Sequence, residues 1–453
     1  MVRTKQCGVW LFAGIAILVS TGGLANTICV PQDYSTIQAA INAANSGDTI
    51  IVDAGTYTEN LNITKSVTIS GVDKDSVILH PPYSDYGIGV SGAGSNVTIE
   101  NITIIAGNAR HFLIHVSGVQ NFTVQNVKIV GAGRTATPGG FPLGGLDMNA
   151  VGGATVRNVE LMDVSRNGIA LTNSTSVTLE NIYVHDSGVS SGWAGVAIYA
   201  NAVGSFSVTF AGTNAVVNTP IGVYIEDYPG ATVNVIAPPG TVVFGEQSVA
   251  PLLKLGLGST PNLDMTAWGL GLYGKVYAPE SPTPPYNTGV AFYATVDEAL
   301  AAAVADPVQA LYSVVFDLEG DRFVVGPGMQ IQRALNASQT GDTVLVKAGT
   351  YVTQALIGKG IVLQGEPGAV IQAPGSPQTY TIAESSAVFD PIIFAYGGTL
   401  VGSNVFGPEI SFTDVLYLTV DGQNVVPPTG SRLVGILYRN VHGTIQGNTI
   451  GNL

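Results

Sequence analysis

A stretch of 35 residues occurs twice in this chain and constrains its fold more than any other feature. Residues 37–71 read IQAAINAANSGDTIIVDAGTYTENLNITKSVTISG, and residues 331–365 read IQRALNASQTGDTVLVKAGTYVTQALIGKGIVLQG. The copies are separated by a constant offset of 294, without a gap, and are identical at 16 of 35 positions. Internal repetition indicates structural units that bury their apolar faces against neighbours. We therefore expect two similar beginnings of a stacked architecture.

The repeated stretch predicts one short helix followed by short strands. From Ile37 onward, apolar residues recur at the i, i+3, i+4, i+7 spacing of an amphipathic helix. Ser35 and Gln38 have the spacing of a capping box. Strands are expected over 49–52 and 67–69, separated by glycine turns. This order is typical of a strand solenoid whose helix covers the first coil. A helix–strand unit of an α/β domain is the alternative, but no such alternation follows the first copy.

Downstream of the first copy, pairs of short β-branched strands recur with an asparagine between the two strands. The intervals between these asparagines are 25, 32 and 23 residues, which suits a coil of three strands. Asparagine tolerates the left-handed backbone of a tight corner, and its amides can hydrogen-bond from coil to coil. We expect a structural ladder formed by Asn101, Asn126, Asn158 and Asn181.

The string TIQAAI…GDTIIVDAGTYTEN resembles the opening of proteins in the pectin-lyase-like superfamily. The resemblance is strong over 35–71 and 331–365 and diffuse elsewhere. It implies an all-β fold, a right-handed parallel β-helix with short N-terminal cap helices, here with two solenoid starts. The opening is also similar to pectinesterases, but their QDTL, DFIFG and GRPW motifs are absent, as are the NTD, DD, GHG and RIK motifs of polygalacturonases. The resemblance therefore implies a fold and not a particular reaction.

The N-terminus predicts a secretory signal peptide over residues 1–25. Arg3 and Lys5 precede an apolar run over 9–19, and small residues at 23 and 25 suit cleavage before Asn26. The run is too short to span a bilayer, so we expect no transmembrane segment in the mature chain. The protein is then expected to be secreted, extracellular or part of the cell envelope.

The rest of the chain divides by pattern into three segments. We predict a first parallel β-helix over 26–245, a Pro-rich connector or small irregular module over 246–322, and a second parallel β-helix over 323–453. Residues 295–303 (TVDEALAAA) fit either a degenerate cap helix or part of a small α+β insertion. The last rungs lack a polar closing segment, so we expect a truncated chain or an end covered by a partner.

The charge balance excludes some partners. The chain has a net charge of −14, which becomes −16 once Arg3 and Lys5 leave with the signal peptide. Such a charge repels nucleic acids and anionic membranes. It also disfavours a polyanionic glycan, unless a cation or a local arginine cluster intervenes.

Candidate site residues emerge when the segments after the ladder asparagines are aligned. Residues at equal offsets in a solenoid stack about 4.8 Å apart. Stacked carboxylates can hold Ca²⁺ or share acid and base roles, and arginines can bind a sugar carboxylate. The predicted catalytic residues are Asp163, Asp186, Arg166 and Arg134; Arg110 and His185 are predicted to bind substrate, and Asp163 and Asp186 to hold calcium. An ion-paired surface turn is the alternative explanation.

Two functions remain open on the sequence alone. The first is a secreted or cell-surface β-helix protein that serves as a glycan-binding or structural module, with a polysaccharide or cell-envelope glycan as its partner. The second is a polysaccharide lyase, or another carbohydrate-active enzyme, that acts on an acidic polysaccharide. His111 and His115 are four residues apart, but the strand-rich context argues against a metal-binding pair.

Overall fold

The computed structural model describes residues 5–6, 9–10, 25–82, 86–92, 95–106, 111–131, 143–188, 193–238, 241–244, 252–256, 261–263, 274–277, 290–317, 319–382, 387–397, 399–401, 404–406, 412–422, 425–427 and 430–453. The predicted signal peptide lies largely outside these residues; within it, β1 (Lys5–Gln6) pairs antiparallel with β2 (Val9–Trp10). None of the helices in the described ranges has the length and hydropathy needed to cross a bilayer. The chain forms two compact units, Met1–Gly269 (unit 1) and Leu270–Leu453 (unit 2).

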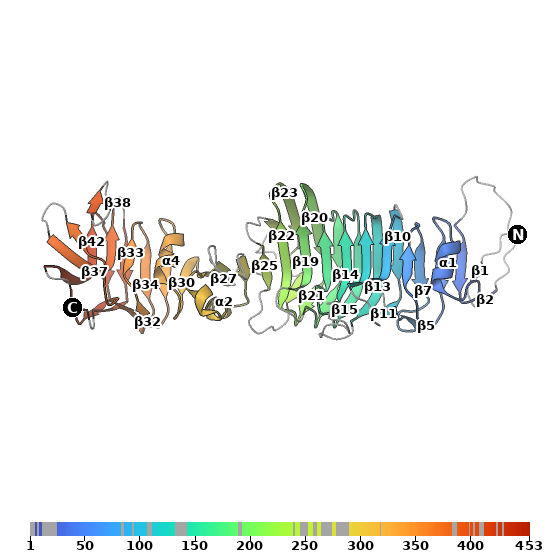
Figure 1. Ribbon diagram of the computed structural model, residues 1–453, viewed down its shortest axis with the longest axis horizontal. Coiled ribbons are helices and arrows are strands. Elements are labelled where there is room, and N and C mark those ends of the chain that lie inside the picture. The colour runs from blue at the N-terminus through green and yellow to red at the C-terminus, as the bar shows by residue number, and fades with distance from the viewer. Residues whose placement is uncertain are drawn as a thin grey trace. The chain divides into compact units, whose positions relative to one another are not determined.

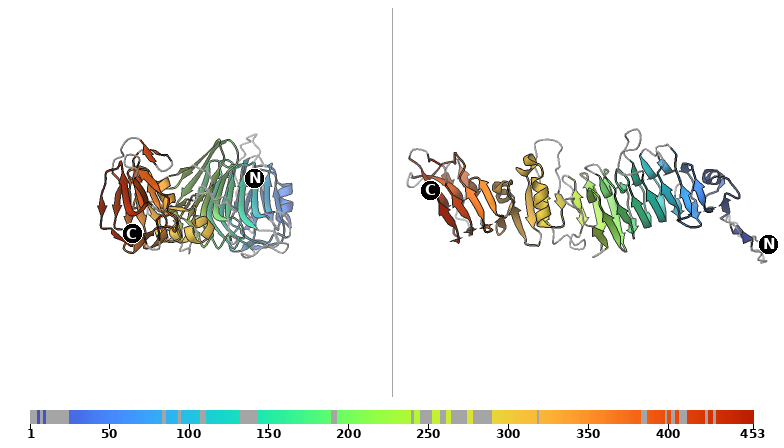
Figure 2. Two further views of the ribbon diagram at one scale, coloured as in Figure 1. Left: turned by 60° about the vertical axis from the view of Figure 1, so that its left-hand side comes forward. Right: turned by 90° about the horizontal axis from the view of Figure 1, so that it is seen from below.

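Unit 1 is a stack of parallel coils, each contributing strands to three sheets (Figures 1 and 2). The first sheet contains β3 (Thr27–Val30), β4 (Thr49–Val52), β7 (Thr68–Gly71), β10 (Ser95–Glu100), β13 (Gln120–Val130), β15 (Thr155–Met162), β17 (Val177–Glu180), β20 (Gly204–Ala211), β23 (Ala231–Ile236) and β26 (Asn262–Leu263). The second contains β5 (Gly55–Tyr57), β8 (Val77–Leu79), β11 (Thr103–Ile105), β18 (Tyr183–His185), β21 (Asn214–Val217) and β24 (Val242–Phe244), together with the later halves of β13 and β15.

The third sheet of unit 1 carries the candidate site. It consists of β6 (Leu61–Ile63), β9 (Tyr86–Ser91), β12 (Phe112–Ser117), β14 (Gly144–Asn149), β16 (Ile169–Thr172), β19 (Ala194–Ala200), β22 (Ile221–Asp227) and β25 (Leu253–Leu255). Inward positions such as Ile114, Val116 and Met148 are fully buried. The residues that alternate with them, such as His115 and Ser117, point away from the core. Because β25 and β26 pair with β22 and β23, stacking continues beyond residue 245.

The predicted asparagine ladder is confirmed. All four asparagines have left-handed backbone φ angles between 52° and 57°. The amide nitrogens of Asn126, Asn158 and Asn181 each donate to the amide oxygen of the asparagine one coil earlier, at 3.2, 3.0 and 3.1 Å. The ladder ends where the backbone N–H of Thr213 donates to the side-chain oxygen of Asn181. These residues therefore have a structural role.

A short helix, α1 (Ile37–Ala43), covers the beginning of unit 1 (Figure 1). It buries Ile37, Ala40 and Ile41 against the first coil. The predicted cap residue is wrong by one position, because Thr36 is the N-cap and its hydroxyl accepts from the backbone N–H of Ala39 at 3.1 Å. Ser35 immediately precedes this cap.

Unit 2 begins with antiparallel strands and two helices. Strands β27 (Gly274–Tyr277), β28 (Val290–Phe292), β29 (Val314–Asp317) and β30 (Arg322–Val325) pair antiparallel in the order β28-β27-β29-β30. Helix α2 (Val296–Val304) packs on β27 and β29, and α3 (Pro307–Ala310) follows. Of the two alternatives for 295–303, the structure thus shows the small α+β arrangement.

A second parallel β-helix then starts at α4 (Ile331–Ala337). Its first sheet runs β30-β31-β34-β40-β43, with β31 (Thr343–Val346), β34 (Val362–Gly365), β40 (Asp414–Leu416) and β43 (Ile445–Gln446). The second contains β32 (Gly349–Val352), β35 (Ala369–Gln372), β41 (Thr419–Asp421) and β44 (Thr449–Gly451). The third contains β33 (Ala355–Ile357), β37 (Ala387–Tyr396) and β42 (Arg432–Arg439), joined by the antiparallel β36 (Tyr380–Ile382); β38 (Thr399–Val401) and β39 (Asn404–Phe406) form a hairpin.

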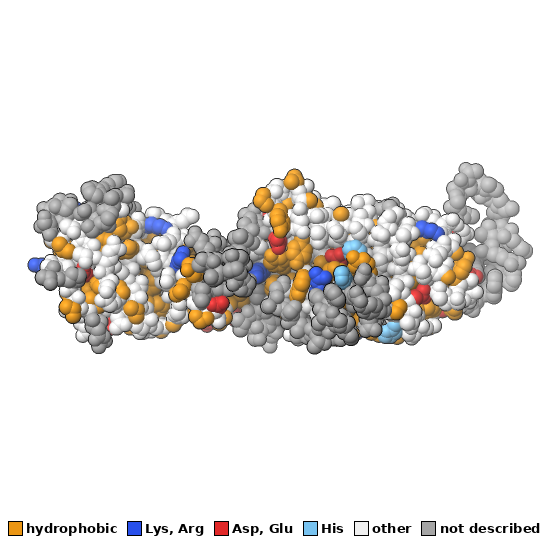
Figure 3. Space-filling view, viewed as in Figure 1, with side chains coloured by type: hydrophobic (Ala, Val, Ile, Leu, Met, Phe, Trp, Pro, Cys, Tyr) orange, Lys and Arg blue, Asp and Glu red, His pale blue; other side chains and the backbone are white. Residues whose placement is uncertain are grey.

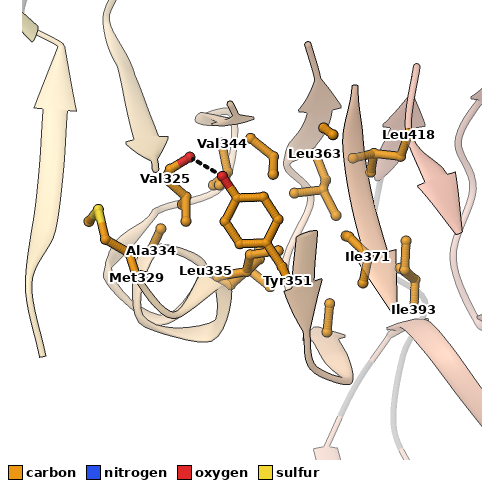
Figure 4. Packing of buried hydrophobic residues seen from close by; sticks show 14 of the residues in the cluster. Val325, Met329, Ala334, Leu335, Val344, Tyr351, Leu363, Ile371, Ile393 and Leu418 are labelled. Atoms are coloured by element: carbon orange, nitrogen blue, oxygen red, sulfur yellow. Dashed lines mark hydrogen bonds between the residues drawn. The ribbon is translucent and has the colours of Figure 1, made fainter. Parts of the chain in front are cut away.

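The core of unit 2 closes around Tyr351, whose ring lies between α4 and the inward side chains of the following coils (Figure 4). Its hydroxyl lies 3.0 Å from the carbonyl oxygen of Val325 and 2.9 Å from that of Lys347. The predicted parallel β-helix, with short cap helices and two solenoid starts, is confirmed by the parallel pairing within each unit.

Candidate functional site

The sequence-predicted residues divide between two places in unit 1. Arg110 and Arg134 lie outside the described residues. Asp163 and Asp186 stack one coil apart, as predicted, because Met162 pairs with His185 in the parallel register of β15 and β18. Both aspartates have left-handed φ angles, 58° and 51°. This turn conformation favours short polar side chains, so the fold itself explains an aspartate at each position.

His185 belongs to the same corner and faces out from the second sheet. Its Nδ1 lies 2.7 Å from an Asp186 carboxylate oxygen, and its ring stacks on Tyr183 with centroids 4.2 Å apart. The other Asp186 oxygen accepts from the amide of Asn218. On its far side, His185 Nε2 is 3.6 Å from the Glu160 carboxylate. We call His185, Tyr183, Asp186 and Glu160 the second-sheet cluster.

Arg166 lies instead at the start of the third sheet. Its guanidinium carbon is 4.5 Å from the centroid of the Trp193 ring and 5.1 Å from that of the Phe112 ring. A cation between two aromatic rings gains about 0.5–2 kcal/mol from each, depending on solvent exposure. The turn after β15 thus places Arg166 among third-sheet residues and not beside Asp186.

Backbone contacts fix this arrangement of Arg166. The backbone N–H groups of Ser165 and Arg166 both donate to the carbonyl of Leu143, at 3.0 and 2.9 Å. The Phe112 ring lies over Gly144 of the next strand, where a Cβ atom would come within 2.3 Å of the ring. Gly144 therefore leaves room for the ring on which the guanidinium of Arg166 stacks.

An acidic residue whose charge acts on Arg166 contacts a histidine on the neighbouring strand. Asp147 and His115 face each other across the paired strands β14 and β12, with Asp147 Oδ2 2.6 Å from His115 Nδ1. The His115 ring stacks on Tyr86, with centroids 4.2 Å apart and planes at 13°. Asp147 is largely buried, so its contact with His115 is shielded from solvent.

Two tyrosines extend the site along β19 and β22. Tyr199 and Tyr224 have ring centroids 5.7 Å apart and pack against the buried apolar residues Ala194, Ala197 and Ile221. The side-chain amide of Asn167 donates to the Tyr199 hydroxyl at 3.2 Å. The Tyr224 hydroxyl donates to Glu226 at 2.6 Å. Both phenol groups are thus fixed in orientation.

Burial controls the electrostatics of these residues. It lowers the pKa of the Arg166 guanidinium, while the charges of Asp147 and Tyr199 act to raise it. Burial likewise raises the pKa of Tyr199 and of Tyr224, and Glu226 raises that of Tyr224 further. The Arg166 Nε atom is buried without a hydrogen-bond partner in the described structure. The site therefore contains a cation whose hydrogen-bonding capacity is not fully used.

We call His115, Asp147, Arg166, Trp193, Tyr199 and Tyr224 the third-sheet face. In the space-filling view, the surface over β14 and β19 shows apolar side chains next to basic, acidic and histidine side chains (Figure 3). This combination of flat rings and orienting polar groups can contact a ligand that has both an apolar face and polar groups.

The predicted calcium ligands do not combine into a metal site in the described structure. Asp186 uses one carboxylate oxygen on His185 and the other on Asn218. Within the described ranges, no group of three or more His, Cys, Asp or Glu side chains is arranged to hold a metal ion.

The sequence prediction identified Arg166 but missed the residues around it. Asp147, Tyr199 and Tyr224 lie on third strands of their coils and Trp193 immediately precedes one, whereas the alignment covered only the segments just after the ladder asparagines. A usable signal was present in the outward positions of β12 and β14, where LIHV and GLDM place His115 and Asp147 at the same offset.

Comparisons with known proteins identify no family. No family model matches the sequence. A "Cell surface glycoprotein" of Methanothermus fervidus is 30% identical over 126 residues, which cover 26% of this chain and 21% of that protein. The chain thus spans about a fifth of the length of this curated relative.

Solved structures with similar stacks have low similarity. They include the catalytic domain of a GH87 alpha-1,3-glucanase in complex with nigerose, with 14% identity, a TM-score of 0.33, and coverage of 96% of this chain and 70% of that chain. Pectin methylesterase PemA from Erwinia chrysanthemi has 10% identity and a TM-score of 0.25, and the match covers 50% of this chain and 81% of that chain. The function of this protein is therefore argued from its own side chains.

Proposed function

We propose that the protein is a secreted or cell-surface glycan-binding protein that holds a polysaccharide on the third-sheet face of unit 1. The observation that carries this proposal is Arg166, whose guanidinium carbon lies 5.1 Å from the centroid of the Phe112 ring and 4.5 Å from that of the Trp193 ring. A cation fixed in this way can bind an acidic group of a sugar without first ordering a flexible side chain.

The aromatic residues supply the second half of the proposed contact. The ring of Trp193 and the tyrosine pair Tyr199 and Tyr224 present flat apolar surfaces beside Arg166. Sugar rings have apolar faces that can pack on such surfaces, while Glu226 can accept from sugar hydroxyls. The chain as a whole is acidic, so a local arginine is needed for an acidic glycan to bind.

An extracellular location fits this function. The charged start and the apolar run before residue 25 favour export. The partial relative from Methanothermus fervidus is described as a cell surface glycoprotein, which supports the same location. A polysaccharide or cell-envelope glycan would be the natural partner at such a surface.

Calorimetric titration with acidic and neutral oligosaccharides tests the proposal. Trp193→Ala and Arg166→Gln should each weaken binding of an acidic oligosaccharide by about tenfold or more, because each removes a buried contact. Arg166→Lys retains the charge but not the planar stacking, so it should recover only part of the affinity. Thermal unfolding of each variant checks that the fold is retained.

Tyr183→Ala is the matched control. Tyr183 is 42% exposed and belongs to the second-sheet cluster. Its removal should leave glycan affinity within about twofold of the native value, since a contact outside the site contributes little. If Tyr183→Ala abolishes binding while Arg166→Gln does not, the second-sheet cluster is the binding site and the third-sheet assignment is wrong.

A lyase activity is the second candidate function. It is favoured by Arg166, a predicted catalytic residue whose guanidinium lies on the third-sheet face next to the rings of Phe112 and Trp193. In β-elimination, a base removes the proton at C5, the C4–oxygen bond breaks, a C4–C5 double bond forms, and the leaving oxygen is protonated. Unsaturated products absorb in the ultraviolet. Their appearance with the native chain and loss with Arg166→Gln would favour the enzyme over the binding module.

A further inference from the structure

His115 and Arg166 act on one carboxylate, that of Asp147. Asp147 Oδ2 lies 2.6 Å from His115 Nδ1, and the charge of Asp147 also acts on the Arg166 guanidinium. When His115 is neutral, Asp147 offsets the charge of Arg166 and the three groups have a net charge of zero. When His115 is protonated, they have a net charge of +1. Protonation of His115 therefore changes the charge presented to a ligand at Arg166.

We propose that His115 makes the third-sheet face a pH-dependent binding site, with higher affinity for an acidic glycan at mildly acidic pH. This inference rests on the proposed glycan-binding function and specifies how that site is regulated. Its structural basis is the alternation of charges from His115 through Asp147 to Arg166 along the third-sheet face.

The groups that face His115 support this assignment. The ring stacks on Tyr86 of β9, a strand that presents Gly89 at the position in register with His115. From β14, on the other side, it faces Asp147. Phe112, at a centroid distance of 6.5 Å, lies beside the imidazole and also contacts Arg166. In the described structure, Asp147 is thus the acidic group in direct contact with the imidazole of His115.

The direction of the effect follows from these charges. Loss of a proton from the imidazole as the pH rises removes the positive charge of His115. Asp147 then neutralises Arg166 more completely, and an anion loses part of its attraction to the site. Affinity should therefore fall as pH rises, by about tenfold between pH 5 and pH 8 at low ionic strength, and by less in high salt.

Calorimetric titration of the full chain across this pH range provides the test. One ligand carries carboxylates (oligogalacturonate) and the other carries sulfates (a sulfated dextran oligosaccharide). Because sulfates stay ionised across this pH range, a pH dependence seen with the sulfated ligand comes from protonation of the protein and not of the ligand. With both ligands, His115→Gln should give a nearly pH-independent affinity close to the native value at pH 8. Asp147→Asn should raise affinity at pH 8 several-fold, because it removes the neutralising charge.

His111→Gln is the matched control. His111 lies near the Tyr86 ring, with centroids 6.3 Å apart, but one residue outside β12. This variant should retain the pH dependence. The proposal is overturned if His115→Gln keeps the full dependence, if His111→Gln removes it, or if Asp147→Asn weakens binding at pH 8. Absence of binding by the native chain at every pH would instead reject the proposed function, whereas strong but pH-independent binding would reject only the role of His115.

Discussion

The two cap helices begin their stacks with almost the same contacts, although they lie 294 residues apart in the sequence. In unit 1, the Gln38 side chain donates to Asn42 and exchanges two hydrogen bonds with the backbone of Asn62 in β6. In unit 2, Gln332 donates to Asn336 and makes the same pair of bonds to the backbone of Leu356 in β33. In each unit, the glutamine side chain thus makes hydrogen bonds that a preceding strand would otherwise make to the backbone of the first strand in the third sheet.

The C-terminal ends of the two helices are also satisfied in the same way. Lys65 donates to the carbonyl oxygens of Asn42 and Ala44, and Lys359 donates to those of Asn336 and Ser338. A lysine at this end satisfies unpaired carbonyls and complements the helix dipole. The Gln and Lys positions are among the 16 identities of the repeat. The two copies of the repeat are therefore identical at the positions whose side chains join the cap helix to the coil beneath it.

The helix N-termini differ. At α1, both carboxylate oxygens of Glu59 accept from the backbone N–H groups of Ile37 and Gln38, each at 2.8 Å. At α4, the N-cap residue Gln330 makes no side-chain cap bond, and the position equivalent to Glu59 is Thr353. The comparison shows that contacts between cap and coil are shared by the two caps, whereas N-capping is not.

The largest expected effect on stability follows from truncating the apolar side chains that each cap helix buries against its first coil. Ile41 and Leu335 occupy equivalent positions and are almost fully buried, so Ile41→Ala and Leu335→Ala should each lower the free energy of unfolding by about 2–5 kcal/mol. Urea denaturation of the full chain measures this loss. A cost below about 1 kcal/mol for either variant would show that its helix does not close an apolar core.

A smaller difference is expected at the tyrosine that follows each helix. The Tyr351 hydroxyl lies near two carbonyl oxygens, whereas that of Tyr57 donates to Asp53 alone at 2.8 Å. Tyr351→Phe should therefore cost about 1–3 kcal/mol, because it removes a buried hydroxyl that lies within hydrogen-bond distance of two carbonyl oxygens, and Tyr57→Phe about 1 kcal/mol. Equal costs in parallel urea titrations would contradict the idea that unit 2 depends more on this hydroxyl.

Much of this fold could be predicted because its signals are local. The amphipathic stripe from Ile37 and the left-handed corner residues, such as Asn126, depend on a few neighbouring residues. A prediction from residue type and spacing therefore succeeds for cap helices and ladders. The N-cap was misplaced at Ser35 because Thr36, beside it, is an equally suitable hydroxyl residue.

The third-sheet face could not be predicted in the same way. From Asn126 to Asp147 the chain runs 21 residues, but from Asn158 to the in-register residue Ala170 it runs only 12. Because the turns between the second and third sheets differ in length, equal offsets from the ladder do not identify neighbours on the third sheet. Arg166 shows the consequence, since its sequence position suggested carboxylate partners and the turn instead placed it between two aromatic rings.

A third prediction concerns the N-terminal caps directly. Glu59→Ala removes a carboxylate that accepts from two helix N–H groups, so it should lower the free energy of unfolding by about 1–2 kcal/mol. Thr353→Ala, its equivalent in unit 2, should change it by less than about 0.5 kcal/mol, because no such cap is lost. Chemical denaturation of the two variants compares these costs. A larger loss for Thr353→Ala would mean that α4 is capped through this position after all.

The smallest expected effect is a gain in stability when unit 2 is given the carboxylate N-cap that it lacks. In Thr353→Glu, the new carboxylate would stand where Glu59 stands relative to α1 and could accept from the N–H groups of Ile331 and Gln332. We expect about 0.5–1 kcal/mol of added stability at pH 7, because an anion at a helix N-terminus is favourable. The gain should disappear below about pH 4, where glutamate is protonated, whereas Thr353→Gln should show no gain at either pH. Denaturation at both pH values distinguishes the cases: an equal gain for Glu and Gln would mean that packing, and not the charge at the N-terminus, separates the two caps.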